Sequence, residues 1–464
     1  MRYVPVSGEQ REAMLRAVGA KSIEQLFQDI PSAVRLKRPL DLEKGMSEID
    51  LARSLRELAE ANKPATGFMN FAGAGVYDHY IPSVVDHILR KPEFFTAYTP
   101  YQSEASQGTL QAIWEFQSMI CELTGMEVAN ASMYDGATAF VEAALMACRC
   151  TKRSRIVVAG SVHPEWAEVL YTYSRSGLFS MDVVGAEGGK LDVDQVREQL
   201  DAGVAALLVA DPNFFGVFED VCALGKAAHG VGAMLVCASN PILLSVTKTP
   251  GDAGADIVVG EGQPLGNPMS FGGPGLGFFA CREKHLRQLP GRLVGKTVDA
   301  EGKTAYTLTL STREQHIRRE RATSNICSNH ALNALAAGAY LSAVGSAGLT
   351  GIARACIAKA HYLRSRLIGT KRFSAPFDDA FGYEFALAYD GDAEELHSRL
   401  LDKGILAGVV IEQWQGPELM LFAVTEKRTK EEMDMFVAEV IEIAEAMEKA
   451  EQTEDTETTE AVEQ

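Results

Sequence analysis

Short apolar runs alternate with helical segments between about residue 150 and residue 281, and this alternation constrains the fold more than any other feature. The runs are rich in Val, Ile, Leu and Ala, whereas the segments between them place apolar residues at helical spacing. Parallel strands need a long crossover to return the chain, and helices usually supply it. The sequence therefore predicts an α/β fold with a mostly parallel, buried sheet. The predicted strands include RIVVAG, MDVVG, AALLVADP, AMLVCAS, ADIVVG and GLGFFAC.

The flanking regions have different patterns. Residues 1–60 place apolar residues at helical spacing and predict an N-terminal helical arm. Residues 331–450 combine a long Ala-rich helical stretch with two or three strands and further helices, which predicts a small C-terminal α+β domain after a large domain at 61–330. Residues 451–464 are acidic and almost without apolar side chains, so we expect a disordered tail.

Composition excludes several classes of function. The chain has 464 residues, with 62 acidic and 44 basic side chains and a formal net charge of -18. Such a surface repels phosphate backbones, and no long basic run offsets it, so we expect no nucleic-acid partner. No uncharged stretch of membrane-spanning length and no export signal are evident, and the eight cysteines lack CxxC spacing, so we expect a cytoplasmic protein without a metal site.

Two positions near the predicted strands could contact a ligand. Asp135 ends a polar turn before an apolar helix whose free N–H groups could bind a phosphate, but Asp135 itself is better suited to cap that helix, since its charge repels an anion. His163 follows the strand RIVVAG, at the sheet edge where α/β proteins bind ligands, and could stack on a flat cofactor or move protons. A histidine before a proline is more often simply a helix-entry residue.

Two polar segments are further candidates. The loop 98–104 places Tyr98, Tyr101, Gln102 and Glu104 close together before a helix, a set of side chains that is costly to bury and unusual to leave exposed. The stretch 311–329 is the most basic part of the chain, and it fits either a solvated helix face or an inter-subunit contact with an anion. Walker A, GxSxG and HExxH motifs are absent from the sequence.

Four segments together resemble the glycine decarboxylases, or P-proteins, of the glycine cleavage system, and in particular the first (alpha) subunit of the two-subunit bacterial form. The resemblance runs from Tyr3 to about residue 445. It implies a pyridoxal-phosphate-dependent fold of type I, with a mostly parallel seven-stranded sheet in the large domain. The segments are residues 3–31, FAGAGVYDHYIPSVV at 71–85, residues 96–126 and REQHIRRERATSNICSNHAL at 313–332.

The same resemblance implies that the cofactor residues of this family are degenerate here. The positions of its cofactor histidine and Schiff-base lysine fall at Gln263 and Pro264, and proline has no amine. The aspartate that faces the pyridine nitrogen falls at Ala238, and Asp135 stands at the phosphate cup. His163 alone matches the usual set. We therefore expect this chain to bind no pyridoxal phosphate, which a homologous beta subunit would carry.

We expect this chain instead to contribute residues to the partner's active site. The hypothesis assigns that role to Tyr98, Tyr101, Gln102 and Glu104 of the loop and to Thr323, Ser324 and Asn325, the last three near the phosphate. The resemblance implies an α2β2 assembly that decarboxylates glycine, releases carbon dioxide and passes the aminomethyl group to the lipoyl arm of the H-protein.

Two alternatives remain open. One is a self-sufficient pyridoxal-phosphate decarboxylase that uses another lysine, for which Lys248 is the best substitute by sequence. The other is a non-catalytic regulatory homologue.

Overall fold

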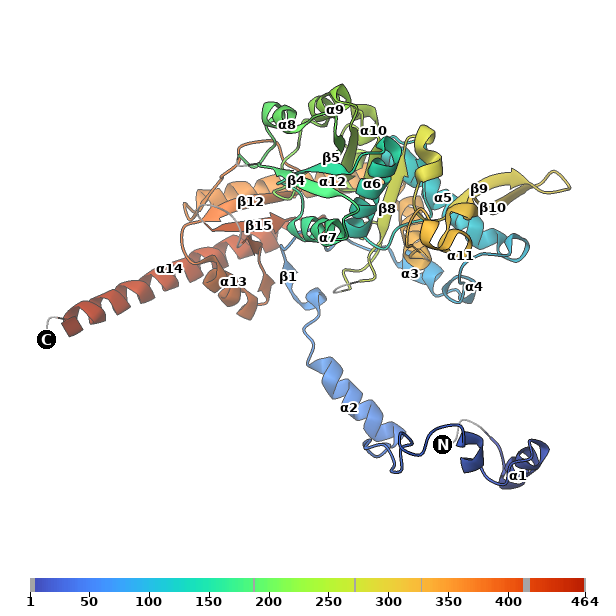
Figure 1. The fold of residues 1–464 in the computed structure, drawn as a ribbon. Helices are drawn as coiled ribbons and strands as arrows, with labels where there is room; N and C mark the ends of the chain where they lie inside the picture. Colours follow the sequence, from blue (N-terminus) through green and yellow to red (C-terminus); the bar gives the residue numbers. More distant parts are fainter. Residues whose placement is uncertain (1–4, 187, 271–272, 327, 412–417, 463–464) are drawn as a thin grey trace. The chain divides into compact units, whose positions relative to one another are not determined.

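The structure, a computed structural model, describes residues 5–462 except 187, 271–272, 327 and 412–417 (Figure 1). It divides into two compact units, Met1–Pro64 and Ala65–Gln464. The first contains the helices α1 (Gly8–Ala17) and α2 (Glu48–Glu60), which begin at the N-caps Ser7 and Ser47. No residue of either helix is buried. This unit is helical, as the sequence analysis expects for residues 1–60. The domain limits given there stay a prediction.

A seven-stranded sheet forms the centre of the second unit, in the order β2-β8-β7-β6-β5-β3-β4. The strands from β3 to β7 are parallel, and β8 and β2 are antiparallel additions at one edge. The mostly parallel seven-stranded sheet is therefore confirmed. Its strands are β2 (Val128–Ala129), β3 (Arg155–Ala159), β4 (Ser180–Val184), β5 (Val204–Asp211), β6 (Met234–Ser239), β7 (Ile257–Glu261) and β8 (Gly277–Cys281).

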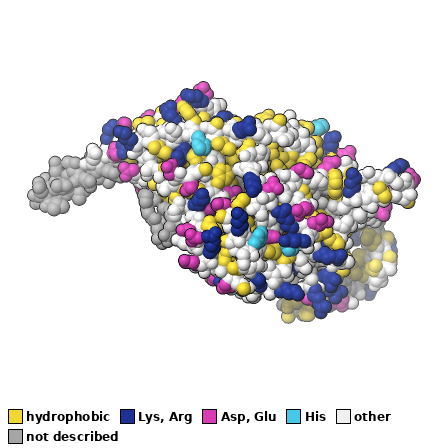
Figure 2. Space-filling model, turned by 90° about the horizontal axis from the view of Figure 1, so that it is seen from above, with side chains coloured by type: hydrophobic (Ala, Val, Ile, Leu, Met, Phe, Trp, Pro, Cys, Tyr) yellow, Lys and Arg dark blue, Asp and Glu magenta, His cyan; other side chains and the backbone are white. Residues whose placement is uncertain are grey.

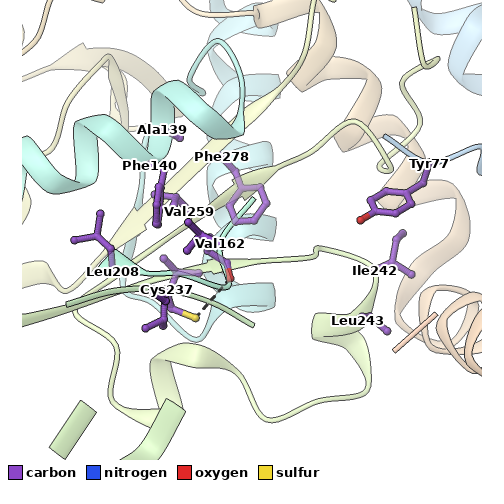
Figure 3. Packing of buried hydrophobic residues seen from close by; sticks show 14 of the residues in the cluster. Tyr77, Ala139, Phe140, Val162, Leu208, Cys237, Ile242, Leu243, Val259 and Phe278 are labelled. Atoms are coloured by element: carbon purple, nitrogen blue, oxygen red, sulfur yellow. Dashed lines mark hydrogen bonds between the residues drawn. The ribbon is translucent and has the colours of Figure 1, made fainter. Parts of the chain in front are cut away.

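Helices cover both faces of this sheet, with α8, α9 and α10 on one side and α6 and α7 on the other (Figure 1). Phe140 of α6 is fully buried and packs with Val259 and Phe278 of the sheet (Figure 3). The helices of the large sheet region are α3 (Ser83–Leu89), α4 (Pro92–Phe95), α5 (Gln107–Thr124), α6 (Gly136–Thr151), α7 (Pro164–Ser174), α8 (Val193–Gln199), α9 (Val221–Gly230), α10 (Pro250–Ala253) and α11 (Gln315–Arg318).

Two smaller strand pairs lie outside the seven-stranded sheet and outside the four-stranded sheet of the C-terminal part. The hairpin of β9 (Leu293–Val298) and β10 (Thr304–Thr309) packs against α5, and the sequence analysis did not predict it. The short β1 (Met69–Asn70) pairs in parallel with β13 (Ile405–Leu406). The pair β1–β13 ties the start of the second unit to its C-terminal part.

A four-stranded antiparallel sheet in the order β11-β12-β15-β14 forms the small domain, where the sequence predicts two or three strands. Its strands are β11 (Phe373–Ser374), β12 (Glu384–Tyr389), β14 (Val409–Ile411) and β15 (Leu419–Ala423), and its helices are α13 (Ala393–Asp402) and α14 (Lys430–Val462). The helix α14 ends at Val462 and so includes residues 451–462, for which the sequence analysis expects a disordered tail; that expectation stays a prediction. Extending a helix already anchored by packing costs less than nucleating a new one.

The helix α12 (Ala331–Gly369) connects the two parts and is interrupted at Gly345, where φ is 62° and ψ is 179°. In the described part of the chain it is the one helix whose length and composition would allow a membrane span. Numerous Ala and Gly residues produce that composition, and its second half carries Arg354, Lys359, Arg364 and Arg366. Length and composition alone are weak grounds for a membrane helix. On the face in Figure 2, acidic and basic side chains are interspersed.

Candidate functional site: a cavity at the carboxyl ends of the parallel strands

A cavity of about 90 Å³ lies where β5, β6 and β7 end. Ala210, Ala238 and Glu261 contribute from the strand ends, and the cavity is at the edge where parallel α/β sheets commonly bind ligands. Small-molecule sites usually enclose ~300–1,000 Å³, so this cavity is small. The other lining residues come from the end of β6, the helix α7, loops and the small domain, and they are Gly75, Tyr77, His163, Trp166, Pro212, Asn213, Phe214, Ser239, Asn240, Pro241 and Glu384.

His163 lines the cavity and is also the N-cap of α7. Its Nδ1 accepts a hydrogen bond from the backbone N–H of Glu165 at 3.2 Å, and its Nε2 lies 2.9 Å from the carbonyl oxygen of Ala74. These partners require a neutral ring protonated at Nε2, and burial lowers its pKa accordingly. The helix-entry interpretation is confirmed, and both ring nitrogens are already occupied.

The start of α6, at the expected phosphate cup, is filled by carboxylates. Asp135 caps the helix, since its Oδ1 accepts from the backbone N–H of Thr138 at 2.7 Å, which confirms the capping interpretation. Glu261, at the end of β7, accepts from the backbone N–H of Gly136 through Oε2 at 2.9 Å. Its Oε1 accepts from the N–H groups of Gln263 at 2.9 Å and Leu276 at 2.8 Å. Burial raises the pKa of Glu261 despite these donors, and Asp135 adds repulsion.

Two other degenerate positions also lie at this sheet edge. Ala238, in β6, is 3% exposed and lines the cavity with a methyl group where the resemblance implies an aspartate. Pro264 is buried in the turn after β7. Beside it, Gln263 accepts from the Tyr77 N–H at 3.1 Å and donates to the Asn267 carbonyl at 2.8 Å. These residues do not fit pyridoxal phosphate. Pro264 has no amine for a Schiff base, Ala238 has no carboxylate for the pyridine nitrogen, and Asp135 and Glu261 fill the position of the phosphate.

A second carboxylate, the buried Glu384 of β12, faces the same cavity, and the sequence analysis did not single it out. Its Oε2 accepts from the Tyr77 hydroxyl at 2.7 Å, and its Oε1 accepts from the Ala74 N–H at 2.6 Å. Burial raises the pKa of Glu384 to about 7 against these two hydrogen bonds. No Lys or Arg lines the cavity among the described residues, so neither Glu384 nor Glu261 has a basic side chain beside it there.

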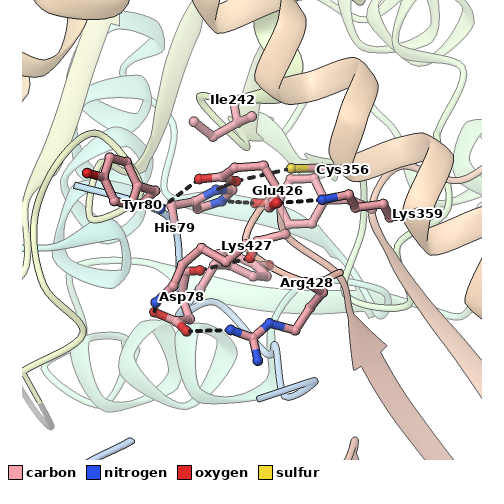
Figure 4. Close-up of polar contacts among 12 residues, drawn as sticks. Asp78, His79, Tyr80, Ile242, Cys356, Lys359, Glu426, Lys427 and Arg428 are labelled. Atoms are coloured by element: carbon pink, nitrogen blue, oxygen red, sulfur yellow. Dashed lines mark hydrogen bonds and ion pairs between the residues drawn. The ribbon is translucent and has the colours of Figure 1, made fainter. Parts of the chain in front are cut away.

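A polar network joins residues 78–80 to residues 426–428, which follow β15, and to Cys356 of α12 (Figure 4). His79 Nδ1 lies 2.7 Å from Glu426 Oε2, and Cys356 Sγ donates to the same oxygen at 3.4 Å. Lys427 Nζ donates to Asp78 Oδ1 at 2.5 Å. The ligand atoms of His79, Cys356 and Glu426 lie within 4.8 Å of one another, as a metal site would require. Because these groups already bind one another, the network needs no metal to be satisfied.

The loop 98–104 is on the surface, away from the cavity lining. Tyr98 and Tyr101 are 74% and 58% exposed, and Gln102 and Glu104 are also exposed. The Tyr101 hydroxyl accepts from Arg292 at 3.3 Å, and buried Arg292 pairs with Glu314, with its Nε 3.4 Å from Oε2. Tyr101 is therefore held in place while its ring remains accessible.

The segment 323–325 is bound to Arg313, which precedes Glu314, the partner of Arg292. The Thr323 N–H donates to the Arg313 carbonyl at 3.0 Å, and Asn325 is exposed. The Ser324 hydroxyl donates to Glu142 Oε1 at 2.6 Å. The structure thus connects both predicted segments through residues 292 and 313–316, whereas His163 and Ala238, two of the degenerate cofactor positions, line the cavity.

The arginines of the basic stretch divide into two kinds. Arg313 is structural, because it donates to the carbonyl groups of Leu289 and Gly291. Arg318, Arg319 and Arg321 are exposed, so either interpretation of the basic stretch still stands for them.

Comparison with known proteins identifies the family. A family model described as the glycine cleavage system P-protein matches residues 1–440. This chain belongs to the P-protein family. It is 48% identical over 441 residues to the "Probable glycine dehydrogenase (decarboxylating) subunit 1" of Desulfitobacterium hafniense, covering 94% of this chain and 99% of that relative. The protein of the same name from Carboxydothermus hydrogenoformans is 50% identical over 440 residues, covering 94% and 98%.

Solved structures agree with the family. A crystal structure of a glycine decarboxylase (P-protein) of the glycine cleavage system in inhibitor-bound form has a TM-score of 0.89 and 42% identity, covering 96% of this chain and 100% of that chain. The glutamate decarboxylase of Lactobacillus brevis, with a TM-score of 0.67 and 15% identity, covers 89% of this chain and 96% of its own and shares the fold alone. The type I fold predicted from the sequence is confirmed.

Proposed function

We propose that this chain is subunit 1 of a two-subunit glycine decarboxylase, active only with a homologous subunit 2. The carrying observation is the match, over 94–95% of this chain and 99% of each relative, to proteins named "Probable glycine dehydrogenase (decarboxylating) subunit 1". The assembled enzyme releases carbon dioxide from glycine and passes the aminomethyl group to the lipoyl arm of the H-protein. In this proposal subunit 2 carries the pyridoxal phosphate. The two subunits form an α2β2 assembly, and the enzyme is located in the cytoplasm.

The cavity chemistry supports this division of labour. A cofactor phosphate at the start of α6 would meet Asp135 and Glu261, and both carry negative charge when ionised. Pro264 supplies no amine, and Lys248 does not replace it, because its exposed side chain donates to Cys222 Sγ at 3.4 Å. Lys248 is also not among the residues that line the cavity. The self-sufficient alternative therefore lacks a lysine at the site.

Exposed apolar surface supports a protein partner. An apolar groove is lined by Phe94, Phe95 and Tyr98 together with Leu332 and Leu335 at the start of α12. Phe95 and Tyr98 are 54% and 74% exposed, although large apolar side chains usually lie inside. The groove adjoins the loop 98–104, so a subunit seated on it would bring its own active site toward Tyr98, Tyr101, Gln102 and Glu104. We include in this proposed contribution to the partner's active site a second segment of this chain, made of Thr323, Ser324 and Asn325.

The experiment combines purified chain, subunit 2 and lipoylated H-protein and measures glycine-dependent exchange of carbon dioxide. Tyr101→Phe removes the hydroxyl that accepts from Arg292, and Thr323→Ala removes the side-chain hydroxyl of a residue whose backbone is bound to Arg313. Each is expected to reduce exchange on the order of tenfold or more, because misplaced groups at an active site lose that much. Co-elution on size exclusion should be unchanged.

Tyr171→Phe is the matched control, since Tyr171 is 52% exposed on α7, outside the proposed site. Full exchange activity in both Tyr101→Phe and Thr323→Ala would remove these residues from the site. Absence of exchange stimulation when the wild-type chain is added to subunit 2 would favour the regulatory alternative.

A further inference from the structure

A depression of about 410 Å³ lies at the amino ends of the parallel strands, at the sheet edge opposite to the cavity described above. Its lining comes from residues at or just before the starts of β3, β6 and β7, and from the carboxyl ends of α6 and α9. The 3-10 helix Glu283–Gln288, which follows β8, closes one side. Small-molecule sites usually enclose ~300–1,000 Å³, so this depression is large enough for a ligand.

A buried carboxylate, Asp256, positions two basic side chains at the depression. Its Oδ2 accepts from the backbone N–H of Leu235 at 3.0 Å and lies 2.8 Å from His229 Nε2, and its Oδ1 lies 3.4 Å from Lys284 Nζ. Asp256 is 6% exposed, whereas the side chains of His229 and Lys284 are 47% and 66% exposed. A histidine held by a carboxylate at one ring nitrogen has the other nitrogen available for a ligand.

Two further nitrogen groups line the same depression. His285 Nε2 is buried and has no hydrogen-bond partner among the described residues. Buried polar atoms in proteins are normally satisfied, so such an atom indicates a missing partner. The Nη1 of Arg153 donates to the carbonyl groups of Val204 at 2.7 Å and Val231 at 3.2 Å. Carbonyl groups carry no net charge, so these contacts leave the positive charge of Arg153 in place.

The accessible polar atoms are therefore nitrogens, which suit a ligand that accepts hydrogen bonds. Asp256 is the one acidic residue of the lining, and it is already occupied by its own partners, whereas Arg153 and Lys284 are both basic. This balance contrasts with the formal net charge of -18 of the chain. Lys and Arg are the side chains that commonly bind phosphate and carboxylate groups.

We propose that this depression binds a small oxyanion, the phosphate or carboxylate group of a metabolite, through Lys284, His229 and His285. The ligand would supply the partner that His285 Nε2 lacks, and Arg153 would add attraction from the far side. This inference does not depend on the proposed function, because it concerns the isolated chain and the opposite edge of the sheet.

The test titrates the full chain with inorganic phosphate and, separately, with succinate, by isothermal titration calorimetry in chloride buffer at matched ionic strength. Lys284→Gln removes an exposed charge, and His285→Leu removes the unpartnered nitrogen. We expect wild type to bind at least one of the two probes, and each variant to bind it on the order of tenfold more weakly, since a lost hydrogen bond to a charged group has about that effect. Binding of phosphate alone identifies a phosphate group as the ligand, and binding of succinate alone identifies a carboxylate.

Lys303→Gln is the matched control. Lys303 is 74% exposed and pairs with Glu301, much as Lys284 pairs with Asp256, but it lies in the β9–β10 hairpin, outside the depression. It should bind the probe as wild type does. The inference is overturned if wild type binds neither probe, or if Lys284→Gln binds as tightly as wild type. Equal weakening by Lys303→Gln would also overturn it, because binding would then reflect overall charge.

Discussion

The buried carboxylate of Glu384 leads to a prediction about the pH dependence of stability. Its pKa rises from 4.5 to about 7 on folding, because burial disfavours the charged form. The folded state therefore holds a proton that the unfolded state releases above pH 4.5, and the free energy of unfolding falls as the pH rises toward 7. A shift of this size corresponds to about 3 kcal/mol, and most of it falls between pH 5 and pH 8.

Glu384→Gln should remove this pH dependence while keeping the contacts. The amide oxygen can accept from the Ala74 N–H, and the amide nitrogen can donate to the Tyr77 hydroxyl oxygen. We therefore expect the variant to gain stability over wild type at pH 8 and to differ little at pH 5. Urea unfolding followed by tryptophan fluorescence at both pH values measures the two free energies. Trp166 lines the same cavity and reports on it.

Glu168→Gln, on the exposed face of α7, is the control, and it should follow wild type at both pH values. The reasoning is refuted if wild type and Glu384→Gln lose the same stability between pH 5 and pH 8. A variant less stable than wild type at pH 8 would equally refute it, because the charged form would then be favoured by folding.

Two further predictions concern the caps and the polar network. Asp135→Ala should lower the free energy of unfolding by about 1 kcal/mol through loss of the α6 cap, and Asp135→Asn should retain most of it, as denaturant titration would show. Although burial opposes it, the hydrogen bond and charge of His79 lower the pKa of Glu426 to about 2. The contribution of ionised Glu426 to the free energy of unfolding is therefore present above pH 4.5 and is lost as the pH falls toward 2. Glu426→Gln should be less stable than wild type at pH 6, and unfolding titrations should converge near pH 2; parallel curves would contradict this.

The parallel sheet could be predicted from the sequence because its strands are buried on both faces and read as continuous apolar runs. Residues 204–209 of β5, for example, are entirely buried. The hairpin β9–β10 was missed because its strands are mixed in polarity and Lys296 to Val298 are exposed. A half-exposed hairpin gives a weaker pattern than a buried strand.

The helix caps at Asp135 and His163 were predictable, since capping depends on residues close in the sequence. The carboxylates at 261 and 384 were not singled out, because their partners Gly136 and Tyr77 lie 125 and 307 residues away. Only tertiary structure brings such groups together. The signal that could have found them is an acidic residue within an apolar strand run, as in VVGE and YEFALAY.

The interruption of α12 at Gly345 has a mechanical consequence. The dihedral angles there belong to a region that is almost restricted to glycine, and no continuous ladder of hydrogen bonds crosses it. The helix cannot act as a stiff lever between the apolar groove at its beginning and the small domain at its end.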